Sequence, residues 1–152
     1  MIAVLQRVKE TSVKVDKKVV SKIDNGLLIF LGVFENDSKK DVDFLVKKVV
    51  GFRIFSDKND KMNLSVKDVN GQILIVSQFT LCADWLKGRR PSFTKAASPT
   101  KGKKLYEYFA NELINYDILV KTGKFGAMMD VSLINDGPVT FVLDSKLKIF
   151  KK

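Results

Sequence analysis

The chain has no histidine and only one cysteine among its 152 residues. Without histidine there is no Ser-His-Asp or Cys-His nucleophile pair, no imidazole general base and no zinc site that uses histidine ligands. One cysteine permits neither an intrachain disulfide nor a CxxC pair. Any catalysis must therefore use carboxylates, hydroxyls, lysines, main-chain groups or groups that the substrate brings.

Long apolar runs are also absent. The longest, residues 27–31, is far too short to cross a bilayer, and the first residues lack the pattern of a signal peptide, so we expect a cytoplasmic protein. The length suits a single domain covering residues 1–152. The 27 Lys and Arg residues exceed the 17 Asp and Glu residues, which gives a net charge of +10. This surplus indicates either a polyanionic partner, such as nucleic acid or a membrane surface, or simply a lysine-rich soluble surface.

Apolar patterning predicts strands mainly in the first and last thirds of the chain, with one more near its middle. The run at 27–31 follows the turn signal Asn25-Gly26 and is continuously apolar, as in a strand that is buried on both faces, and Asn70-Gly71 precedes a similar run. A polar, loop-like stretch is expected after Phe55. The predicted strands are residues 2–8, 13–15, 19–23, 27–31, 73–76, 131–134 and 139–143.

Two segments have the apolar period of amphipathic helices. The first begins at Ser38, where Asp41 completes a capping-box pattern, and ends near Gly51, a residue type common at helix C-termini. The second begins near Ser98-Pro99-Thr100, and its apolar stripe is Leu105, Tyr108, Phe109 and Leu113. The order of elements predicts an α+β fold: a mostly antiparallel sheet or barrel-like core that carries two main helices. The C-terminal lysines Lys146, Lys148, Lys151 and Lys152 indicate a basic strand edge or tail.

Two polar motifs break the local pattern. Ser77-Gln78-Phe79-Thr80-Leu81 continues a buried strand with polar side chains, which either line a pocket or mark the point where the strand reaches solvent. Asn135-Asp136-Gly137-Pro138 lies between two predicted strands and is read as a turn, although proline removes an N–H that the returning strand would use. A Gly-Pro step exposes main-chain carbonyls that could contact a ligand, or it is a plain loop.

The densest basic stretch includes two aromatic residues, Trp85 and Phe93. Such a stretch either contacts phosphates and stacks on bases or forms a solvated loop and helix face. Cys82 is expected to be a buried apolar residue rather than a nucleophile, because no partner base is present. The basic residues are Lys87, Arg89, Arg90, Lys95, Lys101, Lys103 and Lys104.

Both motifs resemble the signature motifs of the D-aminoacyl-tRNA deacylases, also called D-tyrosyl-tRNA deacylases. These are Ser77-Gln78-Phe79-Thr80-Leu81 and the hexapeptide Asn135-Asp136-Gly137-Pro138-Val139-Thr140. Cys82 and Trp85 depart from the family pattern outside both motifs. The resemblance extends to A-V-L-Q-R-V at 3–8, G-L-L-I-F-L-G-V at 26–33, R-I-F at 53–55, K-M-N at 61–63, K-G-R-R-P-S-F at 87–93 and T-G-K-F-G-A at 122–127.

The resemblance implies a homodimeric editing hydrolase that removes D-amino acids, and also glycine mischarged on tRNA-Ala, from tRNA without a metal or a cofactor. Gly137 and Pro138 would form a cis peptide that enters the partner's pocket and rejects L-amino acids. The expected catalytic segment is Ser77, Gln78, Phe79 and Thr80; the expected substrate pocket includes Asn135, Phe125 and Met129; and the expected tRNA contacts are Lys87, Arg89 and Arg90.

The lack of histidine fits the mechanism that the resemblance implies. The ribose hydroxyl beside the ester can assist the attack, so the protein would supply orientation and oxyanion stabilisation. We expect main-chain N–H groups near Phe79 and Thr80 to bind the oxyanion, with Gln78 as an orienting group. Two alternatives stay open: Thr80 acts as a covalent nucleophile, or the protein is a non-catalytic tRNA- or RNA-binding module.

Overall fold

The structure is a computed structural model that describes residues 1–147. Its main element is a curved six-stranded sheet in which the long strand β1 (Ile2–Val15) is central. On one side β1 pairs with β2 (Lys18–Ile23) and β3 (Gly26–Gly32), and on the other with β8 (Asp130–Asp144), all antiparallel. β6 (Gln72–Ser77) and β7 (Val120–Thr122) extend the sheet beyond β3 in parallel. The sheet is therefore mixed, with mostly antiparallel pairings.

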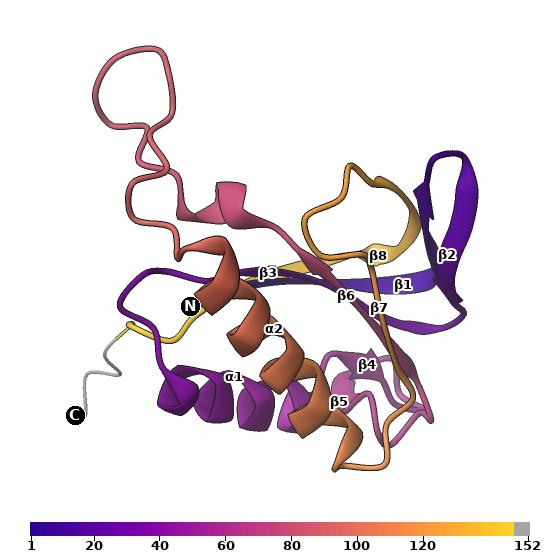
Figure 1. Cartoon of the computed structure of the whole chain (residues 1–152). Helices are drawn as coiled ribbons and strands as arrows, with labels where there is room; N and C mark the ends of the chain where they lie inside the picture. The colour runs from indigo at the N-terminus through magenta and orange to yellow at the C-terminus, as the bar shows by residue number, and fades with distance from the viewer. Residues whose placement is uncertain (148–152) are drawn as a thin grey trace, which may run out of the picture.

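Two helices, α1 (Lys39–Gly51) and α2 (Pro99–Ile114), cover one face of the sheet and pack against each other (Figure 1). The large core lies between these helices and the sheet and includes Phe109, Leu45 and Ile29, all fully buried. A smaller core on the other face forms where the strands curl toward one another, around Val13 and Leu28. The α+β, barrel-like, two-helix fold predicted from the sequence is confirmed.

Both predicted helices begin where the sequence indicates. Ser38 caps α1, its N–H donating to the Asp41 carboxylate at 2.8 Å, and the Ser98 hydroxyl accepts from the Lys101 N–H at the start of α2. Helix α1 ends at Gly51, as the sequence indicates. In α2, Tyr106 is also buried in the apolar stripe, whereas Tyr108 is only partly buried against the core.

The strand predictions need three corrections. Residues 2–15 form one strand rather than two, because β1 has partners along its whole length. The stretch after Phe55 is not simply a loop: β4 (Phe55–Ser56) and β5 (Met62–Leu64) form a small hairpin. Residues 135–138 are not a turn between two strands, because β8 continues through them.

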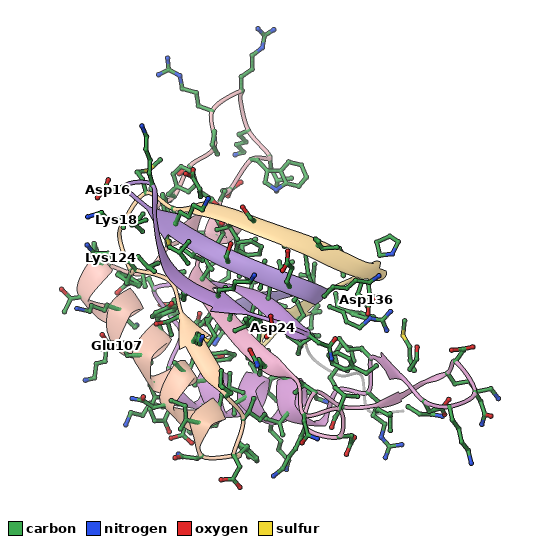
Figure 2. All side chains as sticks on the ribbon, turned by 90° about the vertical axis from the view of Figure 1, so that its right-hand side faces the viewer. Asp16, Lys18, Asp24, Glu107, Lys124 and Asp136 are labelled. Carbon is green, nitrogen blue, oxygen red and sulfur yellow. The ribbon has the colours of Figure 1, made fainter. Side chains whose placement is uncertain are left out.

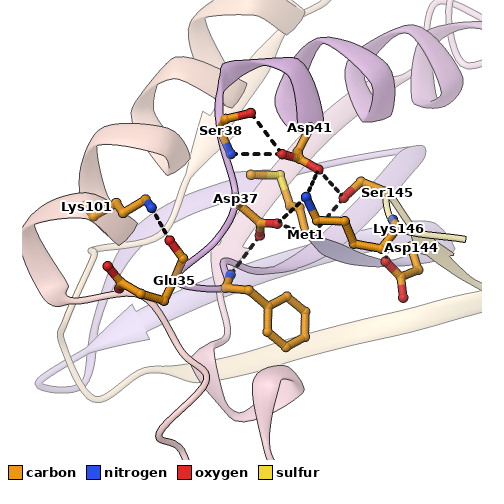
Figure 3. Close-up of polar contacts among 10 residues, drawn as sticks. Met1, Glu35, Asp37, Ser38, Asp41, Lys101, Asp144, Ser145 and Lys146 are labelled. Carbon is orange, nitrogen blue, oxygen red and sulfur yellow. Dashed lines mark hydrogen bonds and ion pairs between the residues drawn. The ribbon is translucent and has the colours of Figure 1, made fainter.

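A polar cluster ties both ends of the described chain to α1 (Figure 3). The Met1 amino group donates to the Asp37 carboxylate and to the Ser145 hydroxyl, both at 2.8 Å, while Lys146 pairs with Asp41 at 2.7 Å. Burial raises the pKa of Asp41, but hydrogen bonds from Lys146, Ser145 and Ser38 outweigh it and hold this pKa below its ordinary value. Lys146 thus has a structural partner instead of forming a free tail; Lys148, Lys151 and Lys152 lie outside the described residues.

Candidate active site

A pocket of about 700 Å³ opens where β3 and β6 end. The first motif forms one wall, from Ser77 to Thr80, and the start of α2 forms another, at Ser98, Pro99 and Gly102. The segment after β7 completes the pocket with Phe125 and Met129. The polar motif therefore lines a pocket rather than simply marking the end of a strand.

The first motif folds into a single 3-10 turn, η1 (Phe79–Cys82), directly after β6. The Gln78 N–H donates to the Leu31 carbonyl at 2.9 Å, which fixes the start of this turn to the end of β3. Gly32 allows the close approach, because a Cβ there would lie 2.9 Å from the Leu81 Cβ and 3.2 Å from the Gln78 carbonyl oxygen. The end of β3, the end of β6 and the turn η1 are therefore packed closely together.

The turn contains two main-chain N–H groups without a recorded acceptor among residues 1–147, on residues that line the pocket. Phe79 and Thr80 are the first two residues of η1, so their N–H groups have no acceptor within the turn. No other hydrogen bond among residues 1–147 uses them. Two adjacent donors of this kind can bind the negative oxygen that develops when an ester carbonyl is attacked.

The side chains of the motif hold one another in place. The Gln78 amide nitrogen donates to the Thr80 hydroxyl oxygen. Phe79 is 56% exposed and contacts Phe93 edge-on, with ring centroids 5.0 Å apart. Phe93 was noted in the sequence only as an aromatic residue within the basic stretch; in the structure it supports the pocket wall.

No side chain that lines this pocket, within the part of the chain that the structure describes, is ionisable. Burial raises the pKa of the nearby Cys82 thiol to about 11, and burial likewise raises the pKa of Tyr106 to about 12. Tyr106 already donates its hydroxyl to the Ile75 carbonyl at 2.8 Å. Cys82 is 1% exposed, so the expectation of a buried, unreactive thiol is confirmed. The pocket offers hydrogen bonds and shape but no general acid or base.

The second motif lies elsewhere, as a bulge in β8. Val8 pairs with Asn135 and Gln6 with Thr140, so residues 136–139 of β8 stand opposite Arg7 alone. Asn135 closes this bulge, since its side chain accepts from the Val139 N–H at 2.6 Å and donates to the Thr140 hydroxyl at 3.1 Å. Asn135, which is expected in the substrate pocket, does not line this pocket of its own chain, and its place in a partner's pocket stays a prediction.

The bulge carries Gly137 and Pro138, both exposed and joined by a cis peptide bond. Gly137 has φ +145, and a Cβ there would lie 2.5 Å from the Val139 side chain. Figure 2 shows the neighbouring Asp136 at the opposite end of the sheet from Asp16 and Lys18. Because the pocket lies at the Leu31 end of β3, which pairs with Ala3, the bulge is four β1 residues away, or roughly 14 Å.

Arg7 of β1 binds the bulge through Asp136. Its guanidinium donates to the Asp136 carbonyl at 2.9 Å and to the Ile54 carbonyl at 2.6 Å, and lies 3.3 Å from the Asp136 carboxylate. The residue is 8% exposed. Sequence reasoning did not assign it a role, although a charged residue within the predicted strand 2–8 was the available signal.

Six of the seven residues of the basic stretch divide into two groups. Lys95 pairs with Asp84 at 2.8 Å, Lys103 lies 3.8 Å from Glu107, and Lys101 donates to the Glu35 carbonyl, so these three have partners within the fold. Lys87, Arg89 and Arg90 are exposed on a loop that projects from the body of the protein (Figure 1). Trp85, 72% exposed, lies on the same loop.

Comparisons with known proteins agree with this geometry. The family model for D-Tyr-tRNA(Tyr) deacylase matches residues 4–144. The D-aminoacyl-tRNA deacylase of Thermosipho africanus is 57% identical over 150 residues, covering 99% of this chain and 100% of the relative. That of Desulfatibacillum aliphaticivorans is 57% identical over 146 residues, covering 96% and 100%.

Two solved structures share the fold. One, named c-Myc DNA Unwinding Element Binding Protein, has a TM-score of 0.89 at 39% identity and covers 95% of this chain and 98% of its own. The other, described as a probable eukaryotic D-amino acid tRNA deacylase, has a TM-score of 0.81 at 17% identity and covers 93% and 97%. No helix in the described part of the chain is long and apolar enough to cross a membrane. From the match of the family model and the curated relatives, the chain belongs to the D-aminoacyl-tRNA deacylase family.

Proposed function

We propose that this protein hydrolyses the ester bond of D-aminoacyl-tRNA, releasing the D-amino acid and free tRNA in the cytoplasm. The observation that carries the proposal is a pocket without ionisable side chains, lined by Phe79 and Thr80, whose main-chain N–H groups have no recorded acceptor among residues 1–147. Such a site can stabilise the oxyanion of an ester but cannot remove a proton. It therefore suits a substrate that contains its own reactive hydroxyl.

In this mechanism the ribose hydroxyl next to the ester assists the attack of water on the carbonyl carbon. The ester C–O bond then breaks, the ribose oxygen leaves with a proton from the water, and the amino acid leaves as its carboxylate. The two N–H groups bind the developing oxyanion, a contribution of about 2.7–4 kcal/mol for one such donor in other enzymes. The hydrogen bond from Gln78 to Thr80 orients the polar edge of the pocket. Thr80 has no base beside it within the pocket lining, which argues against a covalent role.

Chiral selection is assigned to Gly137 and Pro138 of a second copy of the chain. In its own chain this exposed bulge lies away from the pocket, which supports a role in the pocket of a partner in a homodimer. Main-chain carbonyls at Gly137 would contact the α-amino group and leave no room for an L side chain. Glycine has no side chain to exclude, so glycine mischarged on tRNA-Ala would also be removed.

Gly137→Ala tests this role. We expect its D-over-L preference to fall at least tenfold, because φ +145 and the contact with Val139 force the bulge to move. Gly51→Ala is the matched control, since a Cβ at Gly51 meets nothing within 4 Å. An unchanged preference in Gly137→Ala would contradict the assignment.

The projecting loop supplies the proposed tRNA contacts, Lys87, Arg89 and Arg90, which are exposed and free to reach phosphates. The decisive experiment incubates the wild-type protein with D-Tyr-tRNA, L-Tyr-tRNA and glycine-charged tRNA-Ala and measures release of the amino acid. We expect rapid release of D-tyrosine and glycine, with L-Tyr-tRNA left intact. Binding of tRNA with no release would instead favour a non-catalytic RNA-binding module.

A further inference from the structure

A second cleft, separate from the candidate active site, lies between α2 and β7. Its volume is about 820 Å³, and it is bounded by the middle of β2 at Val20 and Ser21 and by residues 120–125. Three lysines line it, Lys103 from α2, Lys121 from β7 and Lys124 from the segment that follows, against one carboxylate, Glu107. Nothing in the function proposed above uses this cleft.

The cleft is continuous with the wall of the active-site pocket. Phe125 lines both cavities, and its ring packs against Tyr106 with centroids 5.5 Å apart. Helix α2 also serves both, since Gly102 lines the pocket while Lys103 and Asn111 line the cleft. From Gly102 to Asn111 the helix rises about 14 Å. A chain that leaves the pocket over Phe125 therefore enters the cleft directly.

The lysines of the cleft differ in their partners. Lys121 donates to the Lys22 carbonyl at 2.7 Å, and Lys103 is 3.8 Å from Glu107 in a pair that is more than half exposed. Lys124 is exposed and forms no ion pair among residues 1–147. In Figure 2, Lys124 and Glu107 lie at the α2 edge of the molecule, across the sheet from Asp136. The cleft is thus remote from the bulge assigned to the partner's pocket.

We infer that this cleft holds the single-stranded 3′ segment of the tRNA, the nucleotides that precede the aminoacylated end, with Lys103 and Lys124 contacting its phosphates. This inference rests on the proposed function. A concave groove that combines cations with apolar and amide groups, here Ile114 and Asn111, suits single-stranded RNA, whose bases are unstacked. The convex loop with Arg89 and Arg90 suits the regular backbone of the duplex instead.

The test compares two substrates: D-Tyr-tRNA and the D-tyrosyl ester of adenosine, which has the same ester and no phosphate. Lys103→Ala, Lys124→Ala and the double variant are measured beside Lys47→Ala, an exposed lysine of α1. For tRNA, each lysine-to-alanine change in the cleft should make the slope of log kcat/KM against log salt concentration shallower by about 0.7. When the salt rises from 0.1 M to 1 M, kcat/KM of the wild type should therefore fall roughly fivefold more than that of a single variant. Hydrolysis of the adenosine ester should not change.

A second arm uses uncharged tRNA with and without its single-stranded 3′ nucleotides and measures binding. The cleft variants should weaken binding of the intact tRNA only, whereas Arg89→Ala should weaken binding of both. Equal losses on both tRNAs, or wild-type behaviour in both cleft variants, would overturn the inference. If wild-type protein hydrolyses neither ester, the proposed function fails, and the binding arm still decides whether the cleft holds RNA.

Discussion

Replacing Arg7 with methionine removes the donor that holds the Asp136–Val139 bulge while keeping an apolar stem in the strand. The guanidinium makes two short hydrogen bonds, to the carbonyls of Asp136 and Ile54, and the residue is 8% exposed. Hydrogen bonds from charged groups contribute about 1.5–3 kcal/mol each. We expect Arg7→Met to lower the free energy of unfolding by about 3 kcal/mol, a fall in Tm of roughly 6–12 °C at this chain length.

The effect of Arg7→Met on the preference for D- over L-aminoacyl-tRNA distinguishes a local role of Arg7 in the bulge from a general loss of stability. With its donor gone, the bulge is free to shift, and a displacement of about 1 Å can cost about 100-fold in a reaction that depends on position. The assay is the ratio of kcat/KM for D-Tyr-tRNA to that for L-Tyr-tRNA, measured well below Tm. We expect the ratio to fall between about tenfold and 100-fold.

The control is Val49→Ala, which opens a cavity at a fully buried position of α1 and should cost about 2–3 kcal/mol without touching the bulge. This variant should keep the wild-type D-to-L ratio. The reasoning is refuted if Arg7→Met keeps the wild-type ratio, or if Val49→Ala loses as much of it as Arg7→Met does.

Three further predictions concern the pocket and the fold. Thr80→Ala should keep more than about a tenth of kcat, because the main-chain donors remain; a loss of 100-fold or more would support a nucleophilic threonine. The ratio of enzymatic to spontaneous ester hydrolysis should show no inflection from a protein group between about pH 6 and pH 8, since no ionisable side chain lines the pocket; a bell-shaped profile would contradict this. Because the pKa of Asp41 is lowered in the folded protein, its carboxylate stabilises the fold at pH values above its ordinary pKa of 3.8, and this stabilisation is lost as the pH falls below 3.8. In thermal melts, Asp41→Asn should therefore unfold more easily than the wild type at pH 7, and its stability should depend less on acid pH. Asp24→Asn is the control and should match the wild type.

Local signals in the sequence were enough for the helices and most strands. The caps at Ser38 and Ser98 predicted where both helices begin, since capping depends on residues within one turn. The continuation of β1 through residues 9–12 could not be predicted, because it depends on pairing with β8 more than a hundred residues away. Short-range apolar patterns carry no information about such distant partners.

The site was predicted in part. Ser77 to Thr80 and the pair Phe125 and Met129 do meet in one pocket, where the sequence alone left a solvent-exposed strand end as an alternative. The turn predicted at residues 135–138 was wrong, because a bulge and a turn have the same residue types and differ only in what lies opposite. Asn135 lies on this bulge, and its place in the substrate pocket stays a prediction. Arg7 was not assigned a role, since it acts through a contact with Asp136, far away in the sequence. The contact of Phe93 with Phe79 was also not predicted, because it joins two separate loop segments.

A pocket built from main-chain donors and uncharged side chains gives group-specific inactivators little to react with. Reagents directed at histidine have no target anywhere in the sequence, and thiol reagents meet only Cys82, whose pKa of about 11 and burial keep it from forming a thiolate. Electrophiles that trap activated serines or threonines need a base beside the hydroxyl, and none of the side chains around this pocket supplies one. A useful inhibitor would instead imitate the shape of the aminoacylated ribose and replace its scissile ester with a bond that resists attack.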